Sequence, residues 1–125
     1  MSIADWCIMV AAILPYFWVI LAKAGKQYNN AAPRPQLEQA EGYRKRAFWA
    51  QLNAFEAFPP FAAAVIVAQM HHVAQATVDI MALSFIAARV LHAVFYLLNL
   101  SSLRSLAWAM GFALVIGLFI LSAQA

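Results

Sequence analysis

Charged residues are scarce in this sequence. Lys, Arg, Asp and Glu make up only 10% of its 125 residues, while 66% of the residues are hydrophobic. Soluble domains carry about 25% charged residues, so the composition excludes an ordinary soluble protein. It predicts a membrane protein whose single domain covers residues 1–125.

Cysteine is nearly absent too, since it occurs only at Cys7. A single cysteine excludes an internal disulfide and a metal cluster built on cysteine. The adjacent residues His71 and His72 have no carboxylate or cysteine close by, so we expect an interfacial pair rather than a metal site. The sequence therefore predicts no metal.

Long apolar stretches are what the sequence does contain. They cover residues 3–22, 47–69, 78–98 and 103–123. Each is close to the roughly 20 residues that a helix needs to cross about 30 Å of hydrocarbon. The first stretch lacks the basic n-region and the cleavage site of a signal peptide, and Asp5 comes early in it. Because the second and third connections are short, we predict an all-α, four-helix antiparallel transmembrane bundle.

Basic residues are missing from the connection between the second and third helices and from both termini. They gather in the first connection, residues 23–46, and Arg104 lies at the third. The positive-inside rule therefore places the first and third connections in the cytoplasm and both termini outside. Topology also explains the net charge of +3, so we expect no nucleic-acid partner.

Local signals refine the connections. Pro33 and Pro35 favour an extended, non-helical path in the first connection, and residues 39–46 are expected to extend the second helix. Thr77 together with Asp79 predicts the N-cap of the third helix. Tryptophans near helix ends are typical of interface anchors, and these are Trp6, Trp18, Trp49 and Trp108.

Polar residues recur with the same spacing in the second and third helices. At i, i+3, i+7 and i+10 such residues occupy one face, an arc of roughly 80°. The two stripes are Arg46, Trp49, Asn53 and Glu56, and Arg89, His92, Tyr96 and Asn99. In antiparallel neighbours they face each other, so we expect a Glu56–Arg89 ion pair, Asn53 beside His92, and Tyr96 facing Trp49.

A buried ion pair can serve packing alone. The neighbouring polar groups favour more than that, because His92, Tyr96, Asn53 and Arg104 together offer cationic and hydrogen-bonding groups. We therefore predict a pocket for an anionic polar ligand, open to the cytoplasmic side.

Three segments carry a resemblance to a known family: RAFWAQLNAFEAFPPF, ARVLHAVFYLLN and LRS. Together with the four helices and the basic first loop, they resemble the MAPEG family, the membrane-associated proteins of eicosanoid and glutathione metabolism, and its smaller bacterial members in particular. The resemblance covers nearly the whole chain. It implies a homotrimer in a bacterial inner membrane, with glutathione bound at the cytoplasmic side between adjacent subunits. Membrane lipids and a lipophilic small molecule are the other implied partners.

The resemblance also implies roles for residues. Arg104 and Ser105 match the positions proposed to stabilise the thiolate, and a cation and a hydroxyl beside a thiol do lower its pKa. Leu52 stands where glutathione-using members commonly carry an arginine. The residues implied in glutathione binding are Asn53, Glu56, His92 and Tyr96. Arg89 is expected to be partly structural. Arg46 and either Lys23 or Lys26 are expected at the edge of the site.

Three functions compete at this point. The first is a glutathione-dependent transferase or peroxidase acting on lipophilic electrophiles. The second is a non-catalytic protein that binds a lipid or another ligand in the same cleft. The third is a small proton-coupled multidrug transporter, but such proteins place their essential glutamate in the first helix, which here holds no acidic residue beyond Asp5.

Overall fold

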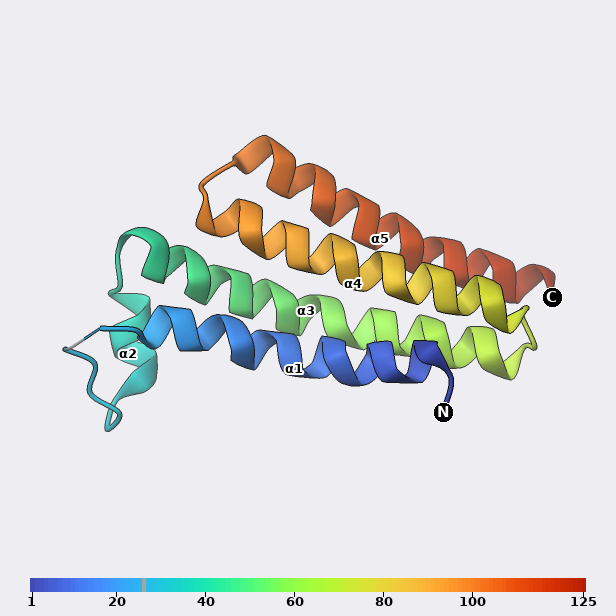
Figure 1. The fold of residues 1–125 in the computed structure, drawn as a ribbon, viewed down its shortest axis with the longest axis horizontal. Helices are drawn as coiled ribbons and strands as arrows, with labels where there is room; N and C mark the ends of the chain where they lie inside the picture. The colour runs from blue at the N-terminus through green and yellow to red at the C-terminus, as the bar shows by residue number, and fades with distance from the viewer. Residues whose placement is uncertain (26) are drawn as a thin grey trace.

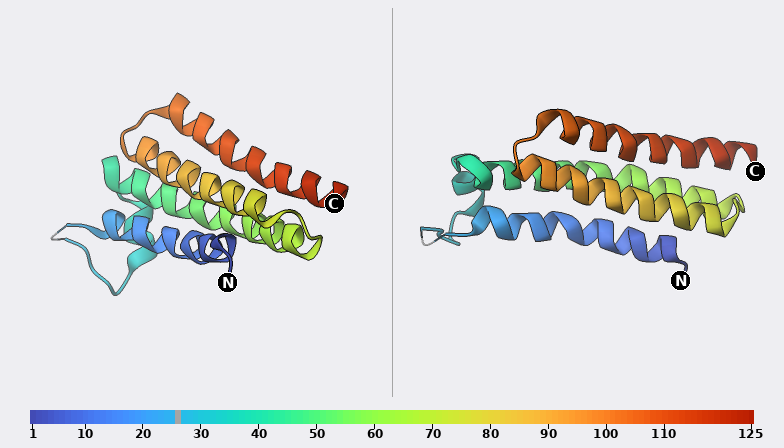
Figure 2. Two further views of the ribbon diagram at one scale, coloured as in Figure 1. Left: turned by 45° about the vertical axis from the view of Figure 1, so that its right-hand side comes forward. Right: turned by 45° about the horizontal axis from the view of Figure 1, so that its top comes forward.

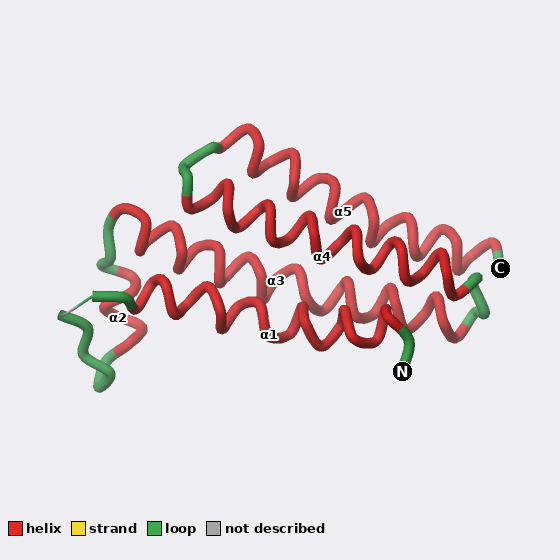
Figure 3. Tube along the Cα trace, viewed as in Figure 1, coloured by secondary structure: helices red, strands yellow, loops and turns green. Residues whose placement is uncertain are grey.

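The computed structural model describes residues 1–25 and 27–125. Its helices are α1 (Ile3–Lys23), α2 (Pro33–Glu38), α3 (Gly42–Met70), α4 (Gln75–Leu97) and α5 (Ser101–Gln124) (Figure 1). Four of them, α1, α3, α4 and α5, are long and apolar enough to cross a membrane. The described residues form no strand (Figure 3), which confirms the all-helical class.

The long helices lie side by side along one direction. α1 packs against α3 and α4, and α5 packs against α4 and α3, so α1 and α5 lie on opposite sides of the α3–α4 pair (Figures 1 and 2). The α1–α3 connection, with α2, and the α4–α5 turn lie at one end of the bundle. We call this the basic end, because most Lys and Arg residues are there. Both termini lie at the other end.

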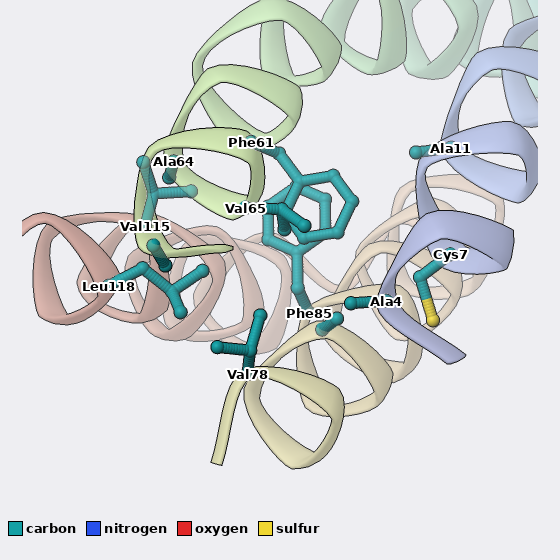
Figure 4. Close-up of a cluster of buried hydrophobic side chains, with 12 residues drawn as sticks. Ala4, Cys7, Ala11, Phe61, Ala64, Val65, Val78, Phe85, Val115 and Leu118 are labelled. Carbon is teal, nitrogen blue, oxygen red and sulfur yellow. The ribbon is translucent and has the colours of Figure 1, made fainter. Parts of the chain in front are cut away.

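Small and aromatic residues form the core. Phe61 of α3 and Phe85 of α4 stack with ring centroids 3.9 Å apart and planes 4° apart (Figure 4). Trp18 is only 5% exposed and packs against Ala50, Ala54 and neighbouring residues, so it is a core residue and not the interface anchor expected. Alanines at these positions let α1 approach α3 closely.

Much of the apolar surface faces outwards. Only 28–33% of the residues in the most apolar window of each long helix are buried. A single soluble chain would bury far more, because exposed apolar area costs about 25 cal/mol per Å². The outer surface is therefore suited to lipid or to another subunit.

The first connection differs from its prediction. Pro33 and Pro35 start the short helix α2 instead of an extended segment, with proline in the first turn, where its missing N–H costs nothing. α3 begins at Gly42, so residues 39–41 lie outside it, and it continues through Pro59 and Pro60.

The predicted cap of α4 is wrong. The N-cap is Ala74, with no side-chain hydrogen bond. Asp79 instead accepts hydrogen bonds from the Ala4 backbone N–H (2.8 Å) and from Gln75 Nε2 (2.9 Å). The first N–H groups of a helix have no partner within that helix, so this carboxylate satisfies a donor of α1 and ties α4 to α1.

Candidate functional site

A polar cavity of about 250 Å³ lies at the basic end between α3, α4 and α5. The tight α4–α5 turn builds it, because Asn99 adopts a left-handed conformation (φ 59°) that ends a helix and that asparagine tolerates. The first turns of α5 thereby return against the last turns of α4. The lining residues are Asn53, His92, Tyr96, Arg104, Ser105 and Trp108.

Aromatic rings hold the cation of this cavity. The Arg104 guanidinium carbon lies 4.5 Å from the centroid of the Tyr96 ring, a cation–π contact. His92 is buried and meets Tyr96 edge to face, with centroids 5.5 Å apart. Arg104 is therefore held at the cavity with its guanidinium above a ring, and the hydroxyl-bearing Ser105 follows it.

Arg89 lies deeper in the bundle and is only 5% exposed. Its Nη2 donates to Asn53 Oδ1 at 2.5 Å and lies 3.4 Å from His92 Nδ1. Asn53 Nδ2 in turn donates weakly to Glu56 Oε2 at 3.4 Å. Asn53 thus connects the buried cation to the carboxylate.

The predicted Glu56–Arg89 ion pair is wrong as a direct contact. Among the described residues, Arg89 donates a hydrogen bond to Asn53, and Asn53 donates one to Glu56. The long arginine side chain carries its charged group away from its own backbone position. Register arithmetic on backbone positions therefore could not separate residue 56 from residue 53. The predicted register holds for Trp49 and Tyr96, whose ring centroids lie 6.2 Å apart.

Two implied binding residues lie away from the polar cavity. Lys23 lines a groove of about 820 Å³ between α1, α2 and α3, together with Gln51 and Leu52. Arg46 donates from Nε to the Leu97 carbonyl at 3.1 Å, where it satisfies a free carbonyl at the end of α4. Lys26, the alternative to Lys23, lies outside the described residues.

Comparison with known proteins decides the family. A model of the MAPEG family matches residues 3–124. The chain belongs to the MAPEG family. The match covers all four spanning helices, confirms the resemblance carried by the polar motifs, and makes this an integral membrane protein. No curated protein and no solved structure gives a match.

The MAPEG chain has a second cavity, of about 190 Å³, next to the polar one. Glu56 and Arg89 line it together with Phe85, Trp108 and Phe112, and Asn53 and Trp108 line both cavities. The sequence did not reveal Trp108 or Phe112 as site residues. A signal for Trp108 was available, because it follows Arg104 by four residues and so shares its helix face.

The chemistry of the site is that of hydrogen bonding and charge. Within the described part of the chain, no three His, Cys, Asp or Glu residues gather into a group that could hold a metal ion. The polar cavity instead presents a cation, two hydroxyls, an imidazole and an amide. Such a set is suited to binding and stabilising an anion.

Proposed function

We propose that this MAPEG protein is a homotrimeric glutathione transferase or peroxidase that acts on lipophilic substrates from the bilayer. The observation that carries the proposal is the convergence of Arg104 and Ser105 with His92, Tyr96 and Asn53 on one cavity. These residues come from three helices and are the ones that the family motifs single out.

The proposed chemistry depends on a thiolate. Arg104 and Ser105 lie in the first turns of α5, whose N-cap Leu100 makes no side-chain hydrogen bond. The free N–H groups and the dipole of such a helix start also favour an anion. A thiol held there would ionise more readily, and its thiolate is the nucleophile that conjugation requires.

The remaining groups suit the ends of the peptide. Glutathione carries two carboxylates and one ammonium group. Glu56 is exposed beside the cavity, and a carboxylate at membrane depth is costly unless it meets a partner such as an ammonium. With Leu52 in place of the family arginine, one carboxylate contact is absent, which lowers affinity by about 1.5–3 kcal/mol, the worth of a charged hydrogen bond.

Several features support a trimer with the site between subunits. The polar cavity of about 250 Å³ is smaller than the roughly 300–1,000 Å³ of typical ligand pockets. Lys23 lines the groove between α1, α2 and α3, and α1 lies on the opposite side of the α3–α4 pair from α5 (Figure 2). A neighbouring copy that turned this groove towards the cavity would enlarge the cavity and bring Lys23 to it.

The test is a thermal-shift titration of the purified protein with glutathione and S-hexylglutathione, followed by a conjugation assay with chlorodinitrobenzene. We expect both ligands to raise the melting temperature and Arg104→Ala to abolish turnover. Glu41→Ala is the control, because Glu41 is exposed and lines neither the polar cavity nor the groove beside Lys23. If millimolar glutathione leaves the melting temperature unchanged, the proposal fails.

A non-catalytic binding function is the second candidate, and the groove of about 820 Å³ favours it. Its walls combine Tyr16, Phe48 and Phe55 with Lys23 and Lys45, a pairing suited to an amphiphile with an anionic head. This function predicts lipid that co-purifies with the protein and no conjugation with chlorodinitrobenzene.

A further inference from the structure

A small cavity of about 10 Å³ lies between α1, α3 and α4, away from α5. We call it the internal cavity. Among its lining residues, Ala57, Phe85 and Arg89 also line the cavity of about 190 Å³. One water molecule needs a cavity of about 10–15 Å³ and two to four polar partners. The internal cavity therefore has the size of a single water and is too small for a lipophilic substrate or a peptide.

A buried donor lines the internal cavity. Arg89 is only 5% exposed, and its Nη2 donates to Asn53 Oδ1. Its Nε has no hydrogen-bond partner, and no other buried side-chain nitrogen or oxygen of the described residues is left in that state. Roughly nine in ten buried polar groups are paired, and leaving a donor of a charged group unpaired is costly. Arg89 Nε therefore requires an acceptor.

The side chains around the internal cavity offer no acceptor. Apart from Arg89 and Trp18, they belong to alanine, leucine and phenylalanine residues. The indole of Trp18 is a hydrogen-bond donor only. The acceptor for Arg89 Nε at this cavity must therefore be a backbone carbonyl or a molecule that enters the cavity.

Pro15 leaves one backbone carbonyl of the cavity without its usual donor. Inside an α-helix each N–H donates to the carbonyl four residues earlier, but proline has no N–H. Pro15 lies inside α1, so the Ala11 carbonyl receives no hydrogen bond from residue 15. Ala11 lines the internal cavity, and both residues are buried. A donor and an acceptor that each lack a partner thus belong to the same small cavity.

We propose that the internal cavity binds one water molecule, which accepts a hydrogen bond from Arg89 Nε and donates one to the Ala11 carbonyl. A direct bond between these two groups is not formed among the described residues, and a bridging water satisfies both. The water joins α1 to the arginine that Asn53 holds from α3. Pro15 thereby gains a function, because it frees the carbonyl that the water needs.

The test detects the water at Arg89 by nuclear magnetic resonance, in the detergent-solubilised full chain with isotopically labelled nitrogen at arginine Nε. No glutathione is added, so the outcome is independent of the proposed function. We expect a dipolar cross-peak between Arg89 Hε and a long-lived water in a rotating-frame experiment, where proton exchange gives the opposite sign. Arg89→Lys assigns the signal by removing it. If that variant does not fold, lysine replacements of the other arginines assign it by elimination.

Two arginines of the same sample are internal controls. Arg44 Nε donates to the Ala22 carbonyl at 3.0 Å, and Arg46 Nε donates to the Leu97 carbonyl at 3.1 Å. Because both atoms already have a protein acceptor, neither should show a dipolar cross-peak with a long-lived water.

Serine substitutions locate the water. Ala54 lines the internal cavity, and a hydroxyl there supplies an oxygen that takes the place of the water. We expect Ala54→Ser to abolish the cross-peak and to leave the melting temperature nearly unchanged. The matched control is Ala64→Ser on the same helix, in the apolar core. It should keep the cross-peak and lower the melting temperature by several degrees, because it buries a hydroxyl among apolar side chains.

A proline substitution tests the acceptor. Pro15→Ala restores the N–H that pairs with the Ala11 carbonyl within α1, so the water loses one partner. The cross-peak at Arg89 should fall at least twofold. It should not change in Pro59→Ala, which replaces an exposed proline of α3 outside the internal cavity.

The proposal is overturned if the Arg89 signal shows no dipolar contact with water. It is also overturned if the Arg46 signal shows an equal contact, since the water would then be general hydration of arginines. A cross-peak that survives in Ala54→Ser overturns it as well, because the water would then lie in the cavity beside α5.

Discussion

Replacing Asn53 with leucine tests how the buried arginine is held. Asn53 Oδ1 is the acceptor for Arg89 Nη2. Arg89 is 5% exposed, and its Nε has no hydrogen-bond partner in the part of the chain that the structure describes. Leucine has nearly the same size but no acceptor, so the guanidinium would lose its main partner. A hydrogen bond to a charged group contributes about 1.5–3 kcal/mol, and we expect Asn53→Leu to lower the free energy of unfolding by that amount.

The comparison variant is Glu56→Gln, which keeps an oxygen acceptor for Asn53 and alters an exposed side chain. We expect it to change stability by no more than about 0.5 kcal/mol, as most surface substitutions do. Both variants would be measured by denaturant unfolding in one detergent, without ligand. If Glu56→Gln destabilises the protein as much as Asn53→Leu, a direct Glu56–Arg89 ion pair holds the arginine and the bridge through Asn53 is wrong.

Three further predictions concern the packing of the bundle and use melting curves or unfolding titrations. Asp79→Ala removes the acceptor that satisfies the Ala4 N–H and should cost about 0.5–2 kcal/mol, as the loss of a helix cap does, while Glu41→Ala, at an exposed position, should cost little. Phe61→Ala deletes a fully buried ring and should cost about 3–5 kcal/mol, clearly more than Phe119→Ala. Arg46→Ala frees the Leu97 carbonyl and should cost about 0.5–1.5 kcal/mol, the net worth of one hydrogen bond.

The spanning helices were predictable from sequence because the length of an apolar run reflects the thickness of the membrane. The polar residues of the site were predictable for a related reason. A polar group at membrane depth must face a partner or a cavity, so the shared spacing around Asn53 and His92 indicated that the two helices face each other there. That geometric prediction holds for Trp49 and Tyr96.

The features that the sequence did not reveal depend on tertiary contacts. In the sequence, Asp79 stands where a residue that stabilises the start of its own helix would be expected. Only the packing of α1 against α4 makes it the acceptor for the Ala4 backbone N–H. Trp18 is of a type common at membrane interfaces, but alanines on a neighbouring helix bury it. Phe112 could not be told from a lipid-facing residue, because an apolar cavity between helices and the lipid outside favour the same side chains.

The most direct test of the central claim is an ultraviolet difference spectrum of glutathione bound to the purified protein at neutral pH. The proposed roles of Arg104 and Ser105 predict a thiolate absorption band that appears on binding and saturates with glutathione. The band should be lost in Arg104→Ala and retained in the control Glu41→Ala. Glutathione that binds without forming a thiolate, or a band that is unchanged in Arg104→Ala, would contradict the account.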